Sequence, residues 1–218
     1  MCESCGAIQP PDVALDRFAV LGVPAGFAVD LVAAEAAFRD LSRRFHPDRF
    51  ATADPRARRA SLQRSVQLNE AWRTIKDPVR RAEYLLHLAG YQVGAEQGAS
   101  APATTEGGER RRIPVPAELL GEVLELREEL AEARSVGDDE REQVMAANVR
   151  TRAEAALTRA AGAIAAATKA STAAERDELL TNATRELISI RYFHRFLEEV
   201  ARQDERKADG AAEASGRV

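Results

Sequence analysis

The 218-residue chain is long enough for one ordinary domain or two small ones, and its 45% hydrophobic content permits packed cores. Its two cysteines lie together at the N-terminus, which excludes a fold stapled by disulfides. The net charge is -4, but the charges are unevenly distributed: the segment from Arg39 to Arg81 contains 12 Lys or Arg and 5 Asp or Glu. Such a basic block is typical of a surface that binds an acidic protein face or nucleic acid.

Residues 1–10 are expected to form a disordered tail. Within it, Cys2 and Cys5 supply half of a four-cysteine zinc site, so they are weak candidates for metal ligands, and a mobile reduced pair is the simpler interpretation. The tail has no basic start followed by an apolar run, and no stretch of the chain reaches membrane-spanning length. We therefore expect a soluble cytoplasmic protein with no membrane partner.

Residues 11–92 predict a domain of four helices. Gly22 and then Pro24 supply the stop of a short first helix, and Asp30 is a suitable N-cap for the second. Pro47 ends the second helix because proline has no amide hydrogen and disfavours helical geometry in the residue before it. One apolar face of the second helix comprises Ala34, Phe38, Leu41 and Phe45.

A longer third helix is predicted from Arg56 to Ile75, packed antiparallel on the second. Asp77 should cap a fourth helix that begins at Pro78. The stripe of the third helix that we expect to face Phe38 and Phe45 comprises Leu62, Val66, Asn69, Trp72 and Ile75.

The rest of the chain predicts a flexible linker and a second helical domain. Residues 93–115 are rich in Gly, Ala, Ser, Thr and Pro and have almost no large apolar side chain. Residues 116–204 should form a three-helix bundle, followed by a disordered tail over 205–218. The helices are expected at Pro116–Val136, Asp138–Lys169 and Thr172–Gln203. The predicted fold class is therefore all-α throughout.

His46, Pro47 and Asp48 form a loop motif between a basic amphipathic helix and the helix that packs on it. With Phe45 before it, Arg49-Phe50 after it and the run Leu68–Trp72, the motif resembles the J-domain family from about Leu15 to Gly90. The resemblance implies that this region binds a DnaK/HscA-class chaperone and stimulates its ATPase. The implied chaperone-binding residues are His46, Pro47, Asp48, Arg39, Arg43, Arg44 and Arg49.

Simpler interpretations of these residues stay open. The tripeptide could be only a helix-terminating loop, and the arginines only a solvated helix face. Acid–base catalysis by His46 and Asp48 would require a nucleophile or metal and a concave pocket, which a loop between two helices does not offer. We therefore expect no enzyme, and no cofactor, because the chain has no phosphate-binding glycine loop and the ATP belongs to a partner.

The first helix of the second domain has two apolar stripes. One comprises Leu119, Val123, Leu126, Leu130 and Ala133 and should face the bundle core. Leu120 and Leu124 remain outside it, beside a row of glutamates. The run Leu119–Leu130 resembles the client-binding helix of HscB-type co-chaperones, the iron-sulfur branch of the J-protein family, as do the runs Phe18–Pro24 and Arg81–Leu86.

This second resemblance implies an IscU-type iron-sulfur scaffold as client. The implied scaffold-binding residues are Leu120, Leu124, Glu125, Glu128, Glu132 and Tyr192. The family commonly has a larger apolar residue where this chain has Gly121, and the linker here is longer than usual. The alternative is that the two leucines belong to a widened core stripe and the glutamates to a solvated face.

Two other functions compete with an iron-sulfur co-chaperone. The chain could be a general J-protein adaptor for another client. It could also be a nucleic-acid-binding helical protein that uses the basic block, although the scarcity of aromatic residues argues against base stacking. We expect the chaperone and the scaffold as partners, and no nucleic acid.

Overall fold

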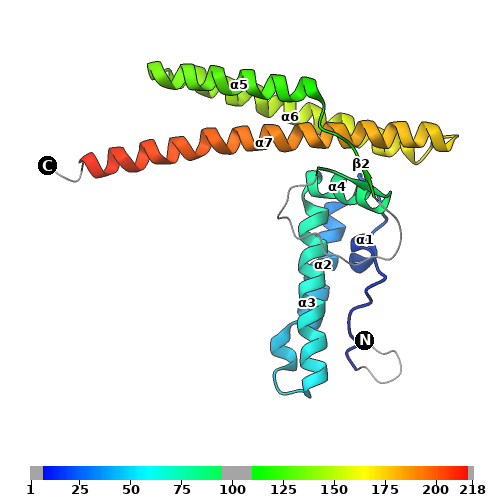
Figure 1. Ribbon diagram of the computed structural model, residues 1–218. Coiled ribbons are helices and arrows are strands. Elements are labelled where there is room, and N and C mark those ends of the chain that lie inside the picture. Colours follow the sequence, from blue (N-terminus) through cyan, green and yellow to red (C-terminus); the bar gives the residue numbers. More distant parts are fainter. Residues whose placement is uncertain (1–6, 95–109, 216–218) are drawn as a thin grey trace. The chain divides into compact units, whose positions relative to one another are not determined.

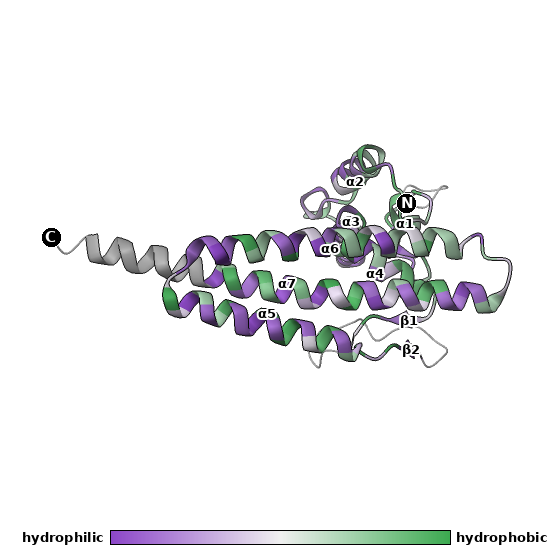
Figure 2. Cartoon of the chain, turned by 90° about the horizontal axis from the view of Figure 1, so that it is seen from above, coloured by the Kyte–Doolittle hydropathy of each residue, from purple (hydrophilic) through white to green (hydrophobic). Residues whose placement is uncertain are grey.

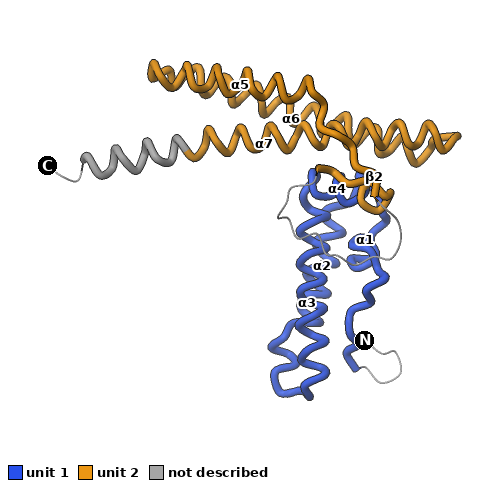
Figure 3. The backbone as a smooth tube through the Cα atoms, viewed as in Figure 1, with its two compact units in different colours: residues 1–85 blue, residues 86–218 orange. Residues whose placement is uncertain are grey.

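The computed structural model describes the backbone of residues 7–94 and 110–215, and side chains in these ranges as far as residue 202. The chain divides into two compact units, Met1–Leu85 and Leu86–Val218 (Figures 1 and 3). Within the described residues there are seven α-helices, one short 3-10 helix and two strands of two residues each. The predicted all-α fold class is confirmed.

The first unit contains α1 (Arg17–Leu21), α2 (Leu31–Phe45), the 3-10 helix η1 (Pro47–Phe50) and α3 (Pro55–Lys76), and α4 (Pro78–Leu88) begins in it. The predicted caps are present. Gly22 ends α1 with φ of 68°, which glycine adopts without a steric cost. Asp30 accepts hydrogen bonds from the first amides of α2, and Asp77 accepts one from the amide of Arg80.

The core of the first unit lies between α1, α2 and α3. Phe45 and Ala34 are buried on α2, and the Phe38 ring stacks on Trp72 of α3 with centroids 5.4 Å apart. The predicted stripe of α3 is wrong for Leu62 and Val66, which are 58% and 50% exposed. The face toward the core instead combines small side chains with two large apolar ones; it comprises Ala57, Ala60, Ser61, Leu68, Ala71 and Ile75.

The second unit contains α5 (Ala117–Val136), α6 (Asp139–Ala167) and α7 (Ala173–Ser215), which pack side by side as the predicted three-helix bundle (Figure 2). Small buried side chains on α6, among them Ala153, Ala156 and Ala160, let its neighbours approach closely. The α7 backbone stays helical to Ser215, beyond the helix end predicted at Gln203.

The predicted linker differs from the structure at its described ends. Arg111–Arg112 (β2), inside the predicted linker, pairs in parallel with Tyr91–Gln92 (β1), which directly precedes that linker, and both strands contact α7 through Asp177. Asp177 of α7 accepts hydrogen bonds from the Tyr91 hydroxyl and the Arg111 guanidinium, and Arg191 donates to the carbonyl oxygen of Gly94 at 3.2 Å. Polar contacts with α7 and burial of the Tyr91 and Val93 side chains therefore order the described ends of this segment. Residues 95–109, the middle of the predicted linker, lie outside the described residues.

Candidate functional site

The turn that follows α2 presents the His-Pro-Asp motif. The helix ends at Phe45 because His46 is extended, with φ of -59° and ψ of 131°, and Pro47 then opens η1. Asp48 lies in the first turn of η1. The chain direction therefore changes within three residues, and the side chains before and after the proline come together.

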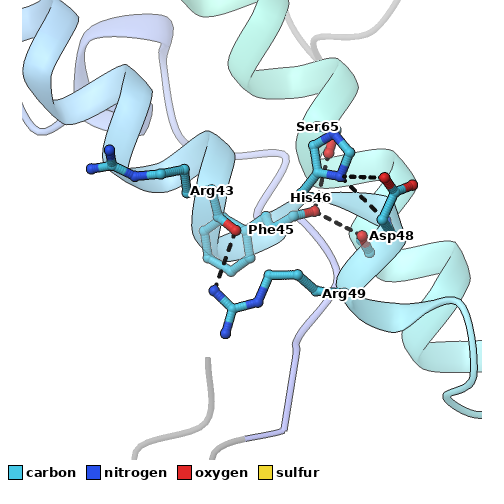
Figure 4. Close-up of polar contacts among 7 residues, drawn as sticks. Arg43, Phe45, His46, Asp48, Arg49 and Ser65 are labelled. Atoms are coloured by element: carbon cyan, nitrogen blue, oxygen red, sulfur yellow. Dashed lines mark hydrogen bonds and ion pairs between the residues drawn. The ribbon is translucent and has the colours of Figure 1, made fainter.

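His46 and Asp48 lie side by side on the surface of this turn (Figure 4). The Nδ1 atom of His46 accepts a hydrogen bond from the amide of Asp48 at 3.3 Å and lies 3.5 Å from the carboxylate atom Oδ2. The imidazole and the carboxylate are 57% and 88% exposed, so both can reach a partner.

The backbone at the start of the turn is held from α3. The carbonyl oxygen of Phe45, which α2 leaves unpaired at its end, accepts hydrogen bonds from the hydroxyls of Ser61 at 2.7 Å and Ser65 at 3.1 Å. Ser61 is fully buried. Sequence reasoning missed both serines, although their four-residue spacing places two small hydroxyls on one face of a helix expected to pack against α2.

The four predicted docking arginines are exposed and weakly held. Arg39 pairs with Glu35 at 2.7 Å, and Arg43 and Arg44 each lie 3.7 Å from the carboxylate of Asp40. Exposed pairs of this kind contribute little stability, so their exchange for a partner's carboxylates costs little. Arg49 donates to the carbonyl oxygen of Arg43 at 3.4 Å, which ties the far side of the turn to α2.

The exposed face of α5 carries the two leucines that the sequence separated from its core stripe. Leu120 and Leu124 are 48% and 58% exposed, whereas Leu119, Val123 and Leu130 are buried against the bundle. The interpretation of Leu120 and Leu124 as a widened core stripe is therefore wrong. A shallow depression on the same helix is lined by glutamates, namely Glu125, Glu128, Glu129 and Glu132.

Two ion pairs join α5 to α6, one through Glu122 and the other through Arg134, both of which lie on α5. Arg152 of α6 pairs with Glu122 and places its guanidinium carbon 4.9 Å from the centroid of the Phe193 ring of α7. Near the other end, Arg134 donates to buried Glu142 at 3.2 Å. The sequence analysis did not find these pairs, because each joins two different helices and forms only when those helices pack.

The remaining candidates are less well joined to this surface. Tyr192 lies half-buried on α7, and the ring contact described for it is with Arg195, at 5.6 Å, rather than with a leucine of α5. Glu132 is exposed but pairs with Arg141 at 3.1 Å. Cys2 and Cys5 lie outside the described residues, among which no group of three or more potential ligands could hold a metal. No helix in the described ranges has the length and apolarity needed to cross a membrane.

The chain is similar to known proteins along most of its length. Residues 115–201 match the family described as the HSCB C-terminal oligomerisation domain. A co-chaperone protein HscB homolog of Vibrio cholerae is 40% identical over 126 residues, which is 58% of this chain and 66% of that protein. The homolog of Ralstonia nicotianae is 41% identical over 122 residues, 56% of this chain and 61% of that protein. Both matches cover less than two thirds of the relative.

Two solved structures share the fold over a longer span. Chaperone HscB from Vibrio cholerae aligns with a TM-score of 0.67 and 28% identity, over 88% of this chain and 99% of that one. The crystal structure of human co-chaperone protein HscB aligns with a TM-score of 0.70 and 25% identity, over 93% of this chain and 89% of that one. The matched C-terminal domain, the relatives named as HscB homologs and these two structures agree with the resemblance to HscB-type J-domain proteins that the sequence indicates.

Proposed function

We propose that the protein is a co-chaperone of iron-sulfur cluster assembly. Its His46–Asp48 turn stimulates ATP hydrolysis by a DnaK/HscA-class chaperone, and its α5 surface delivers an IscU-type scaffold to that chaperone. The observation that carries the proposal is an exposed imidazole and carboxylate at the end of a helix that bears exposed arginines.

The geometry of the turn suits a contact that must be oriented. Pro47 removes backbone freedom between the two polar side chains, and Asp48 offers an exposed carboxylate that can accept hydrogen bonds from a partner's arginine. The arginines of α2 supply long-range attraction to an acidic surface, which accelerates encounter and fixes orientation. Docking and stimulation are thus assigned to neighbouring but different side chains.

The exposed face of α5 suits a protein client rather than a small molecule. Leu120 and Leu124 stand one helical turn apart and would fill apolar pockets of a partner, while Glu125 and Glu128 provide a polar rim. Arg152 and Arg134 fix the helix at two levels, which reduces the entropy that binding would otherwise cost.

Steady-state ATP turnover by the cognate chaperone tests the first role. The protein should raise turnover, and more so together with the scaffold. Asp48→Asn should abolish the stimulation without changing the circular dichroism spectrum. Glu70→Gln, which removes an exposed carboxylate of α3, is the matched control and should stimulate normally. Normal stimulation by folded Asp48→Asn would reject the role of the turn.

Titration calorimetry with the scaffold tests the second role. Leu120→Ala combined with Leu124→Ala should weaken binding at least tenfold, the effect of about 1.4 kcal/mol. Val144→Ala, which shortens an exposed apolar side chain of α6, should leave the affinity unchanged. Equal affinity for the double variant and the wild type would favour a general J-protein adaptor with another client.

A further inference from the structure

Residues 7–12, here called the N-terminal strap, lie along α3. Arg64 of α3 donates from Nε to the carbonyl oxygen of Gln9 at 2.7 Å and from Nη2 to that of Pro10 at 3.1 Å. Gln67, one turn further along the helix, donates to the carbonyl oxygen of Asp12 at 3.0 Å. The Ile8 side chain is buried in the core of the first unit. The strap is therefore held by one apolar side chain and three hydrogen bonds.

The arginine that binds the strap also contacts the residue before the His-Pro-Asp turn. The guanidinium carbon of Arg64 lies 5.0 Å from the centroid of the Phe45 ring, which is buried in the same cluster as Ile8. Burial lowers the pKa of Arg64 from its usual value, and the nearby Asp12 acts in the opposite direction. Arg64 thus joins the strap to the end of α2.

We propose that the N-terminal strap braces the His46–Asp48 turn through Arg64, which makes Arg64 a positioning residue for stimulation of the chaperone. This inference rests on the proposed function. Arg64 does not belong to the exposed docking face, because its donors point to Gln9 and Pro10 within the protein. Its effect must pass through Phe45, whose carbonyl group leads directly into the turn.

The physical reason is that Phe45 is held from two directions. Ser61 and Ser65 hold its carbonyl oxygen, and Arg64 covers its ring. Without the strap, the guanidinium loses two carbonyl acceptors and is free to turn toward water, which removes the nearer of the two guanidinium groups that lie over the ring. The turn would then sample more orientations, and a smaller fraction would present His46 and Asp48 correctly. The arginines of α2 would still dock.

The chaperone's ATP turnover is measured at increasing concentrations of Arg64→Ala and of a chain that lacks residues 1–10. The two curves separate an effect on the orientation of the turn from an effect on docking. Maximal stimulation should fall roughly three- to tenfold, the effect expected from losing charge-assisted hydrogen bonds. The concentration for half-maximal stimulation should change less than about twofold, because docking charges are intact. Arg58→Ala, an exposed arginine of the same helix, should match the wild type.

A double-mutant cycle tests whether Arg64 acts through the strap. Arg64→Ala in the shortened chain should lower maximal stimulation no further than either change alone, since each removes the same brace. Additive losses would overturn the proposal. So would full maximal stimulation by Arg64→Ala, or a rise in the half-maximal concentration alone, which would make Arg64 a docking charge.

The ring resonances of His46 give a readout that does not need the chaperone. The chain has three histidines, so His46→Gln assigns the signals of this ring. Arg64→Ala and removal of residues 1–10 should shift or broaden the His46 signals and leave those of His194, in the other unit, unchanged. Unchanged His46 signals would contradict the proposal that the strap braces the turn.

If Arg64→Ala does not fold, Arg64→Lys, which lacks the guanidinium fork that binds the two carbonyl oxygens, takes its place. Shifted signals without any stimulation by wild-type protein would reject the proposed function alone.

Discussion

The hydroxyl of Ser61 donates a hydrogen bond of 2.7 Å to the carbonyl oxygen of Phe45, and this bond ties the middle of α3 to the last residue of α2. Phe45 directly precedes the exposed His46. A fully buried polar contact thus sets the backbone from which an exposed functional pair projects. The stability of the first unit and the geometry of its turn therefore depend on the same residue.

Ser61→Ala should lower the free energy of unfolding by about 1 to 2 kcal/mol, because the buried carbonyl of Phe45 loses its shorter hydrogen bond. Ser65→Ala should cost less, since its hydroxyl is only partly buried and makes the longer bond of 3.1 Å. Urea unfolding of both variants measures the difference. A smaller loss for Ser61→Ala than for Ser65→Ala would contradict this assignment.

Two leucines of α5 should respond oppositely in stability and in binding. Leu130→Ala removes a fully buried side chain from the bundle and should cost about 2 to 5 kcal/mol. Leu124→Ala shortens an exposed side chain and should change stability by less than about 0.5 kcal/mol, while it weakens binding of the scaffold. Thermal unfolding and calorimetry on the same samples provide the comparison. A large loss of stability in Leu124→Ala would contradict the interpretation of Leu124 as an exposed residue outside the core.

Gly121 offers a place to strengthen α5. A methyl group at this exposed position would meet no atom within 4 Å. Gly121→Ala should therefore stabilise the protein by about 0.5 to 1 kcal/mol through helix propensity. Gly162→Ala on α6, equally open, is the matched control and should give a similar gain.

The two glycines should differ in binding. Gly121→Leu adds an apolar side chain beside Leu120 and Leu124 and should raise the affinity for the scaffold, whereas Gly162→Leu should not. Calorimetry distinguishes them. The client-binding face would not include position 121 if Gly121→Leu left the affinity unchanged, or if Gly162→Leu changed it as much.

Asp177 should make the second unit sensitive to acid. Its hydrogen bond from Tyr91 and the nearby Arg111 guanidinium lower the pKa of this carboxyl group. A lowered folded-state pKa stabilises the protein fully above the unfolded-state value of about 3.9, and this contribution is lost as the pH falls through the folded-state pKa. The free energies of unfolding of the wild type and of Asp177→Asn should differ by a constant amount from pH 8 to 5. The difference should shrink below about pH 4, and a difference that grows there would contradict the assignment.

Local signals in the sequence were sufficient for much of the fold. Asp30, Gly22 and Asp77 act on backbone groups within three or four residues of themselves, so the caps could be predicted without knowing any tertiary contact. The separation of Leu120 and Leu124 from the core stripe of α5 was also predictable. Helical periodicity decides which side chains share a face, and the more complete apolar stripe faced the core.

The same rule failed on α3, where Leu62 and Val66 face solvent while Ala60, Ser61 and Ala71 face the core. Periodicity ranks a face by its hydrophobicity, but close packing of α3 against its neighbours selected the smaller side chains. The strands at the ends of the predicted linker were missed for a related reason. Both strands are held in place by hydrogen bonds to Asp177, which lies 66 residues beyond Arg111 in the chain.

By itself, the sequence determined the all-helical architecture, the caps at Gly22, Asp30 and Asp77, and the motif His46–Asp48, since these follow from propensities and from neighbours along the chain. Tertiary structure alone decided that the turn is held by Ser61, Ser65 and Arg64, and that α5 is held by the ion pairs Arg152–Glu122 and Arg134–Glu142. The physical reason is that a hydrogen bond or ion pair needs two groups within a few ångströms. For residues far apart in the chain, only the packing of the helices brings about that proximity.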